Sequence, residues 1–138
     1  MIIRIGSDQE KQEIMDRYPA TIQVMNGEGY LIVAIEKTEI IGFAFVFRRQ
    51  IPAPIEKTED FINVIEVFKQ EHRRQGVASA IIEVCLKEAK AKDSYQVRAY
   101  SDINNIESHK LWVKNHFAIS PVKMKDGSIY GSFVTYKL

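Results

Sequence analysis

Apolar and polar residues alternate along this chain in a pattern typical of a sheet with flanking helices. Short apolar runs bounded by turn residues predict strands, and apolar residues at helical spacing predict helices. The expected strands are 2–5, 30–35, 40–47, 61–68, 95–100, 117–122 and 129–138, and the expected helices follow Ser7, Gly76 and Asn104. This order predicts an α/β (α+β) fold, in which the strand–helix–strand unit from 61 to 100 requires a parallel strand pair.

Capping signals mark two of the predicted helix starts. Ser7 and Glu10 form a capping box, in which each side chain accepts the other residue's backbone N–H. Asn104 followed by Glu107 predicts a second box of the same kind. The charged segment 51–60 contains two prolines, which stop helices and sheet ladders, so we expect it to be a loop.

The turn after the predicted strand 61–68 has the features of a phosphate-binding turn. Arg73 and Arg74 supply positive charge, and Gly76 allows a ligand to approach the backbone. The first N–H groups of the following helix have no intrahelical acceptor and point from the positive end of the helix dipole. A strand–helix connection that binds nothing is the alternative interpretation.

Composition limits the classes of protein to which the chain could belong. The 138 residues are 46% hydrophobic and 27% charged, which predicts one globular domain over residues 1–138. A net charge of +1 gives no reason to expect nucleic-acid binding. No apolar run reaches membrane-spanning length, and we expect no membrane partner. The single cysteine, Cys85, lies in an apolar helix pattern and predicts a core residue of a cytoplasmic protein.

Two motifs occur in order, about thirty residues apart. The first is Arg73-x-x-Gly76-x-Ala78 after a strand, and the second is Asn105-x-x-Ser108-x-x-Leu111-Trp112-x-x-x-His116-Phe117. The first resembles the pyrophosphate loop of the GCN5-related N-acetyltransferases (the GNAT superfamily), and the second is similar to that family's Asn-x-x-Ala-x-x-Phe-Tyr-x-x-x-Gly-Phe. The resemblance implies a GNAT-like mixed, mostly antiparallel central sheet with a splayed parallel strand pair and flanking helices.

The resemblance also implies acetyl-CoA as co-substrate, held where strands 61–68 and 95–100 splay apart. Main-chain groups at the end of the first strand would pair with the pantetheine arm, and the glycine turn would wrap the pyrophosphate. Helix capping is the alternative role of the asparagine in the second motif. No metal ion is implied. The implied cofactor-binding residues are Val67, Phe68, Arg73, Arg74, Gln75, Gly76, Val77, Ala78, Ser79, Asn105 and Ser108.

Acetyl transfer requires a neutral amine, whereas alkyl amines have a pKa of about 10 and are charged at neutral pH. A base must therefore act before attack on the thioester. Glu66 is the expected base because it is a carboxylate on the strand beside the implied thioester, and Asn63, Glu36 and water are the alternatives. A main-chain N–H at Val67 or Phe68 would stabilise the tetrahedral intermediate.

The second motif departs from the family at two positions. Trp112 stands in the catalytic position of the tyrosine that protonates the departing thiolate, and an indole N–H cannot transfer its proton usefully near neutral pH. His116 replaces the glycine before Phe117, which leaves the backbone of that turn in question. The side chains that could replace the missing acid are Tyr100, Tyr130, Tyr136 and His109.

The expected function is transfer of acetyl from acetyl-CoA to a primary amine of a small molecule, by direct attack in a ternary complex. A protein lysine or N-terminus is the alternative acceptor, and a non-catalytic acyl-CoA-binding module would fit the departure at Trp112. The acceptor groove would lie between the first helix, the loop 48–60 and the closing hairpin. Glu56, Glu59 and Asp60 would attract a cationic amine there or form a solvated loop. Family members often pair through their C-terminal strands, so a homodimer is a further expectation.

Overall fold

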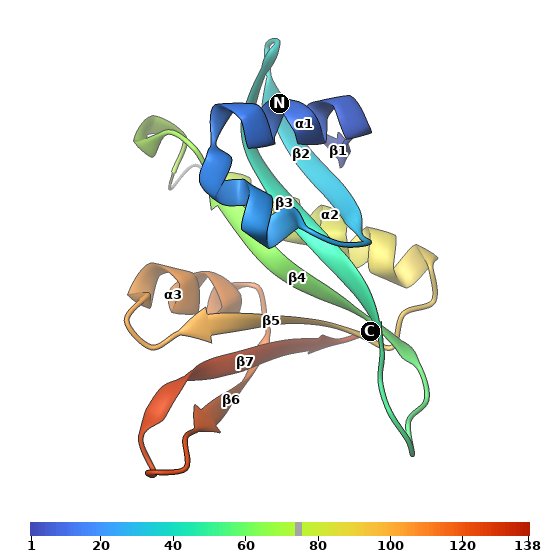
Figure 1. Ribbon diagram of the computed structural model, residues 1–138, viewed down its shortest axis with the longest axis vertical. Helices are drawn as coiled ribbons and strands as arrows, with labels where there is room; N and C mark the ends of the chain where they lie inside the picture. Colours follow the sequence, from blue (N-terminus) through green and yellow to red (C-terminus); the bar gives the residue numbers. More distant parts are fainter. Residues whose placement is uncertain (74–75) are drawn as a thin grey trace.

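The computed structural model describes residues 1–73 and 76–138. Within these residues the chain forms one seven-stranded sheet with helices on both faces (Figure 1). The strands are β1 (Ile2–Ile5), β2 (Tyr30–Glu36), β3 (Glu39–Gln50), β4 (Thr58–Val67), β5 (Gln96–Asp102), β6 (Ala118–Lys123) and β7 (Ile129–Lys137). The helices are α1 (Asp8–Arg17), α2 (Val77–Ala91) and α3 (Ile106–Lys114), with 3-10 helices η1 (Pro19–Met25) and η2 (Gln70–His72).

The strands follow the order β1-β2-β3-β4-β5-β7-β6 across the sheet. All neighbouring strands run antiparallel except β4 and β5, which run parallel because α2 connects them. The mixed, mostly antiparallel sheet with one parallel pair is therefore confirmed. No helix within the described residues has both the length and the apolar character to cross a membrane.

Apolar clusters cover the sheet on both faces. On the front face of Figure 1, α1 and η1 pack Ile14 and Met25 against the sheet. On the back face, α2 packs Ile81 and Cys85 against the sheet, and Trp112 of α3 joins the same cluster. Burial raises the pKa of the Cys85 thiol, which is consistent with a core residue. Strand β4 contributes to both clusters, as expected for a strand that is apolar on both faces.

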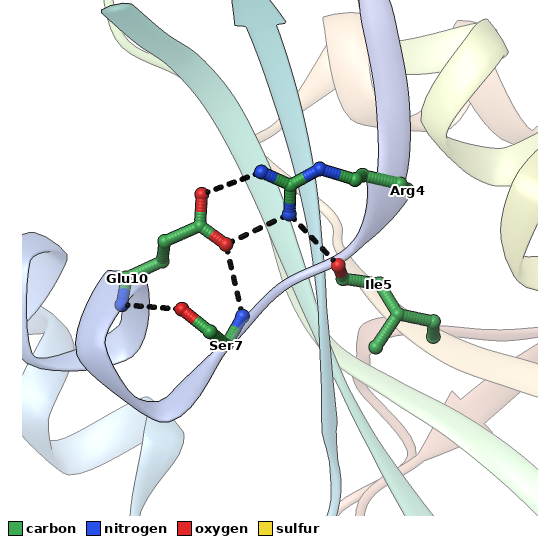
Figure 2. Close-up of polar contacts among 4 residues, drawn as sticks. All are labelled: Arg4, Ile5, Ser7 and Glu10. Carbon is green, nitrogen blue, oxygen red and sulfur yellow. Dashed lines mark hydrogen bonds and ion pairs between the residues drawn. The ribbon is translucent and has the colours of Figure 1, made fainter.

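The capping box predicted at the start of α1 is confirmed (Figure 2). The Ser7 hydroxyl accepts the Glu10 N–H at 3.1 Å, and the Glu10 carboxylate accepts the Ser7 N–H at 2.9 Å. Arg4 adds two further hydrogen bonds to Glu10, at 2.8 and 3.0 Å. Hydrogen bonding to Arg4 lowers the pKa of the Glu10 carboxyl and ties β1 to the first turn of α1.

Three boundaries expected from the sequence are wrong. β3 continues to Gln50, so that residues 48–50 belong to the strand and not to the expected loop. β4 begins at Thr58, so that Glu59 and Asp60 belong to the strand and not to a loop. The N-cap of α3 is Asn105, whose side chain accepts the Ser108 N–H at 3.0 Å, and not Asn104. The error at Glu59 and Asp60 has a physical cause, because the charges of these two residues are balanced by partners distant in the sequence.

Candidate active site

The parallel strands β4 and β5 pair over only part of their length. Residues 59–62 of β4 face residues 96–99 of β5, and pairing ends at Ile62 and Ala99. Both strands continue beyond this point and diverge, as Figure 1 shows. From there β4 keeps only β3 as a neighbour, and β5 keeps only β7. One edge of each strand is therefore free of sheet hydrogen bonds in the region that we call the divergence.

A β-bulge in β4 lies where the divergence begins. Phe45 of β3 faces Val64 and the next residue, Val46, faces Ile62, so that Asn63 has no partner across the strand pair. An extra residue of this kind bends a strand and increases its twist. The side-chain amide of Asn63 donates to the main-chain oxygen of Val24 in η1 at 2.8 Å. The bulge therefore turns β4 away from β5 and fixes η1 beside it.

Beyond the bulge, successive residues of β4 direct their main-chain N–H and C=O groups alternately toward β3 and away from it. The Phe68 N–H donates to the Ile41 oxygen of β3 at 2.9 Å. Hydrogen-bonded and non-hydrogen-bonded positions alternate in an antiparallel pair, so Val67 directs its N–H and C=O away from β3 and into the divergence. The Val67 oxygen accepts Arg73 Nε at 3.1 Å. Of the two expected N–H donors, the one at Phe68 is thus engaged by β3, while Val67 directs its own toward the expected cofactor.

Glu66 projects from the front face of β4. Its neighbours on that face, Val64 and Phe68, pack against the front cluster, whereas Glu66 itself is exposed. No hydrogen bond or ion pair of its carboxylate occurs among the described residues. The alternative base Glu36 instead contacts His72 Nε2 at 3.1 Å. Glu66 is therefore the carboxylate that the front side of the divergence presents.

The glycine turn before α2 has the expected backbone. Gly76 has a φ of +77°, a left-handed conformation that glycine adopts without strain, and a Cβ there would meet no atom of the described residues within 4 Å. It precedes α2 without any side-chain cap. The first N–H groups of α2, at Val77, Ala78 and Ser79, therefore lack an intrahelical acceptor. The expected contacts at Arg74 and Gln75 lie outside the described residues.

Asn115 is a residue of this region that the sequence analysis missed. Its side-chain amide donates to the Ser79 hydroxyl at 3.1 Å and to the Leu111 oxygen at 2.8 Å. It joins the end of α3 to the first turn of α2, and so connects the two motifs. The next residue, His116, has a φ of +67° and keeps the left-handed backbone of the glycine that it replaces. The sequence signal of this helix end was an asparagine just before the position that the family fills with glycine.

The second motif makes a local hydrogen-bond chain. Asn105 caps α3 through Ser108, and the Trp112 Nε1–H donates to the Ser108 hydroxyl at 3.1 Å. Trp112 is 2% exposed and packs edge to face on Phe117 with ring centres 4.9 Å apart. The structure therefore places Trp112 in the back core with its N–H engaged. Ser108 also lies 3.4 Å from the hydroxyl of Ser101 at the end of β5.

The expected substitutes for the missing acid lie elsewhere. Tyr100 follows the last paired residue of β5, and its hydroxyl is buried without a hydrogen-bond partner among the described residues. The hydroxyl lies over Gly131 of β7, where any Cβ would collide with it, and so points away from β4. Burial raises the pKa of Tyr100, and Asp102 adds to this. Tyr136 packs against the back cluster, and Tyr130 is exposed.

Two of the three acidic residues expected in the acceptor groove, Glu59 and Asp60, are buried, which corrects both interpretations of them. Asp60 is fully buried and binds the hydroxyls of Tyr30 and Ser94 and, at 3.4 Å, Arg48 Nε. Burial raises the pKa of Tyr30, and the hydrogen bond to Asp60 adds to this.

The second of these carboxylates, Glu59, is also buried, at 3% exposure. It binds Gln96 at 2.7 Å and Arg98 at 2.6 Å. Of the three expected acids, only Glu56 is exposed. Glu59 and Asp60 therefore neither attract a cationic amine nor form a solvated loop.

Solved structures with the same fold include several acetyltransferases. NAA60 from Arabidopsis thaliana, solved with a bisubstrate analogue, has a TM-score of 0.72 at 16% identity, covering 99% of this chain and 98% of that one. A GNAT family acetyltransferase from Elizabethkingia anophelis with acetyl-CoA bound gives 0.66 at 18%, covering 99% and 97%. Ribosomal-protein-alanine N-acetyltransferase from Brucella melitensis gives 0.72 at 15%, covering 100% of both chains. These TM-scores show a shared fold.

No curated protein sequence matches the chain. The family model for the Acetyltransferase (GNAT) family, in contrast, matches residues 4–117. The match spans β4, the glycine turn, the divergence and both motifs, and it ends at Phe117, the last residue of the second motif. The chain therefore belongs to the GNAT family of acetyltransferases, and it is an acyltransferase that uses acetyl-CoA as its co-substrate.

Proposed function

We propose that residues 1–138 act as a single catalytic domain that transfers acetyl from acetyl-CoA to a primary amine of a small molecule. The transfer occurs by direct attack in a ternary complex. The observation that carries this proposal is the end of β4–β5 pairing at Ile62 and Ala99 while both strands continue. It leaves a main-chain edge of β4 free to hydrogen-bond an extended ligand, as a neighbouring strand would.

The cofactor phosphates would bind at the start of α2, on the back side of the sheet. Three free helix N–H groups and the open space around Gly76 support this position. The pantetheine arm would then run along the free edge of β4 toward the front, where Glu66 is exposed. The proposed cofactor contacts are Val67, Phe68, Arg73, Arg74, Gln75, Gly76, Val77, Ala78, Ser79, Asn105 and Ser108.

The acceptor amine would arrive from the front side, opposite the cofactor. Glu66 would take a proton from the ammonium group, and the amine nitrogen would attack the thioester carbon. The Val67 N–H, directed into the divergence, would donate to the oxyanion. The attack forms the C–N bond; collapse of the intermediate then restores the carbonyl and breaks the C–S bond, and the nitrogen loses its remaining extra proton to water. A thiol has a pKa of about 8.5, so the thiolate can leave without an acid at Trp112 and take a proton from water.

Cofactor binding at the glycine turn can be tested by thermal unfolding. Excess acetyl-CoA should raise the Tm by several degrees more than pantetheine, which lacks the pyrophosphate. Gly76→Val should abolish this difference, because a β-branched residue opposes the left-handed backbone and fills the space beside the first N–H groups. Gly76→Asn is the control for backbone strain, since asparagine tolerates the conformation. An undiminished shift in Gly76→Val would place the cofactor elsewhere.

The acceptor class can be tested by thiol release from acetyl-CoA over a panel of amines. We expect release with small primary amines. Protein amines are the second candidate, because structures of similar fold include a ribosomal-protein-alanine N-acetyltransferase. A cavity of about 270 Å³ at the end of β5, bordered by the exposed Ile103, Ile106 and Ile129, could seat an apolar side chain. Release with peptides alone would favour that candidate, and release with neither would overturn the proposed reaction.

A cytoplasmic location and a homodimer remain parts of this proposal. The homodimer would form through the closing hairpin of β6 and β7, at one edge of the sheet. Light scattering at tens of micromolar protein should give twice the mass of the chain. A monomer at that concentration would exclude the dimer without affecting the proposed reaction.

A further inference from the structure

Cationic and aromatic side chains form a continuous strip on the front face, beside the divergence. Arg49 of β3 lies over the Phe61 ring at 4.0 Å, and Arg98 of β5 lies 5.3 Å from the same ring. Arg98 also lies 4.8 Å from the Phe133 ring of β7. We call these four residues the arginine strip. It crosses β3, β4, β5 and β7 next to the last paired residues of β4 and β5.

The two arginines of the strip carry two positive charges, and the carboxylate beside them, Glu59, balances only one. Glu59, the carboxylate opposite Arg49 in the strand register, is buried and already binds Arg98 and Gln96. Arg49 is exposed and has no acidic partner among the described residues. A guanidinium that stacks on an aromatic ring keeps its N–H fork free for an anionic oxygen group. The excess charge therefore lies where the expected acidic groove would have been negative.

We propose that the acceptor carries an anionic oxygen group, a carboxylate or a phosphate, which Arg49 binds while the acceptor amine lies at the divergence. This inference rests on the proposed acetyl transfer and specifies its acceptor. Phe61 precedes Glu66, the proposed base, by five residues of β4, so about 16 Å of strand separates the Arg49 site from the reacting amine. The acceptor must span most of this distance, which excludes simple α-amino acids and favours long ω-amino acids or short peptides.

The test compares ω-amino carboxylates of increasing length with the matching ω-amino amides, which lack the charge. We expect kcat/KM to be highest for carboxylates that span about 16 Å, and to exceed that of the matched amide roughly tenfold. Phosphonates of the same length show which anionic group binds better. Equal values for carboxylates and amides, with thiol still released, would overturn the anionic acceptor and leave acetyl transfer standing.

Substitutions at Arg49 and at a control lysine test whether Arg49 is the group that binds the anion. Arg49→Gln should raise KM for the preferred carboxylate roughly tenfold, with little change in kcat and in the acetyl-CoA-induced Tm shift. Arg49→Lys should restore only part of the loss, because lysine keeps the charge without the planar fork. Lys125→Gln, at the exposed β6–β7 turn, removes the same charge and should leave KM unchanged. An equal loss in Arg49→Gln and Lys125→Gln would show a general field effect and overturn the site.

A binding measurement separates the two proposals when no thiol is released. Calorimetric titration of the preferred ω-amino carboxylate into the CoA-bound protein should give Arg49-dependent binding. Binding that Arg49→Gln abolishes, without thiol release, would keep the anion site and overturn the reaction. Absence of binding by every carboxylate and phosphonate would overturn the anion site.

Discussion

The two halves of β4 belong to one strand and have opposite surroundings. In the first half, residues 58–62, the strand pairs with β3 on one side and β5 on the other, and its two charges are buried and fully partnered. In the second half, residues 63–67, the strand pairs with β3 alone, and its one charge, on Glu66, is exposed. The first half holds the sheet together, and the second leaves main chain and a carboxylate free for chemistry.

A single extra residue accounts for this difference. Without the bulge at Asn63, β4 would continue to pair with β5 as well as with β3, and no main-chain group of β4 would be free. The buried ion pairs of the first half then have a clear role. Glu59 joins β4 to Arg98 of β5, and Asp60 joins it to Arg48 of β3, just below the point where the strands part. They fix the three strands where the divergence would otherwise weaken the sheet.

The largest effect on stability is expected from a substitution that removes a buried charge in the first half of β4. Asp60→Ala should lower the free energy of unfolding by about 3–5 kcal/mol, because it leaves the buried Tyr30 and Ser94 hydroxyls and Arg48 without their anion. Glu66→Ala, six residues along the same strand, should change stability little because its side chain is exposed. Denaturant unfolding measures both. Similar losses in the two variants would contradict the contrast between the halves.

The second half should respond in activity rather than stability. Glu66→Gln should lower kcat roughly a hundredfold, since it removes a positioned proton acceptor. The Tm and the Tm shift caused by acetyl-CoA should stay the same, because the glycine turn lies beyond Phe68. Initial rates of thiol release measure the loss, with Glu56→Gln as a matched control on an exposed loop carboxylate. Wild-type rates in Glu66→Gln would assign the base to water or to another group.

Local sequence signals predicted most of the fold correctly. The capping box at Ser7, the glycine turn before α2 and the order of strands and helices along the chain all depend on short-range pattern, and all are confirmed. The sequence failed where the deciding partner is distant. Glu59 and Asp60 looked like loop residues because Arg98 and Ser94, which make them strand residues, lie more than thirty positions away.

The candidate site shows the same division. The glycine turn could be located from the motif, because the left-handed Gly76 and the uncapped start of α2 depend on local backbone. The bulge at Asn63 has no local signal, since it appears only when β4 is paired with β3. The unpaired charge on Arg49 could not be predicted for the same reason. The residues next to Arg49 in the sequence do not indicate that Glu59 binds Arg98 instead.

The smallest effect tests the boundary between the halves. Asn63→Ala removes the hydrogen bond to the Val24 oxygen and should cost about 1 kcal/mol of stability. Asn63→Asp should cost more, because it sets a carboxylate against that carbonyl oxygen with no proton to share. If η1 forms the front border of the acceptor site, both variants should raise the acceptor KM by a few-fold while acetyl-CoA binding stays constant. An unchanged acceptor KM with reduced stability would restrict Asn63 to holding η1 on the sheet, and would place the acceptor nearer to β5 and the arginine strip.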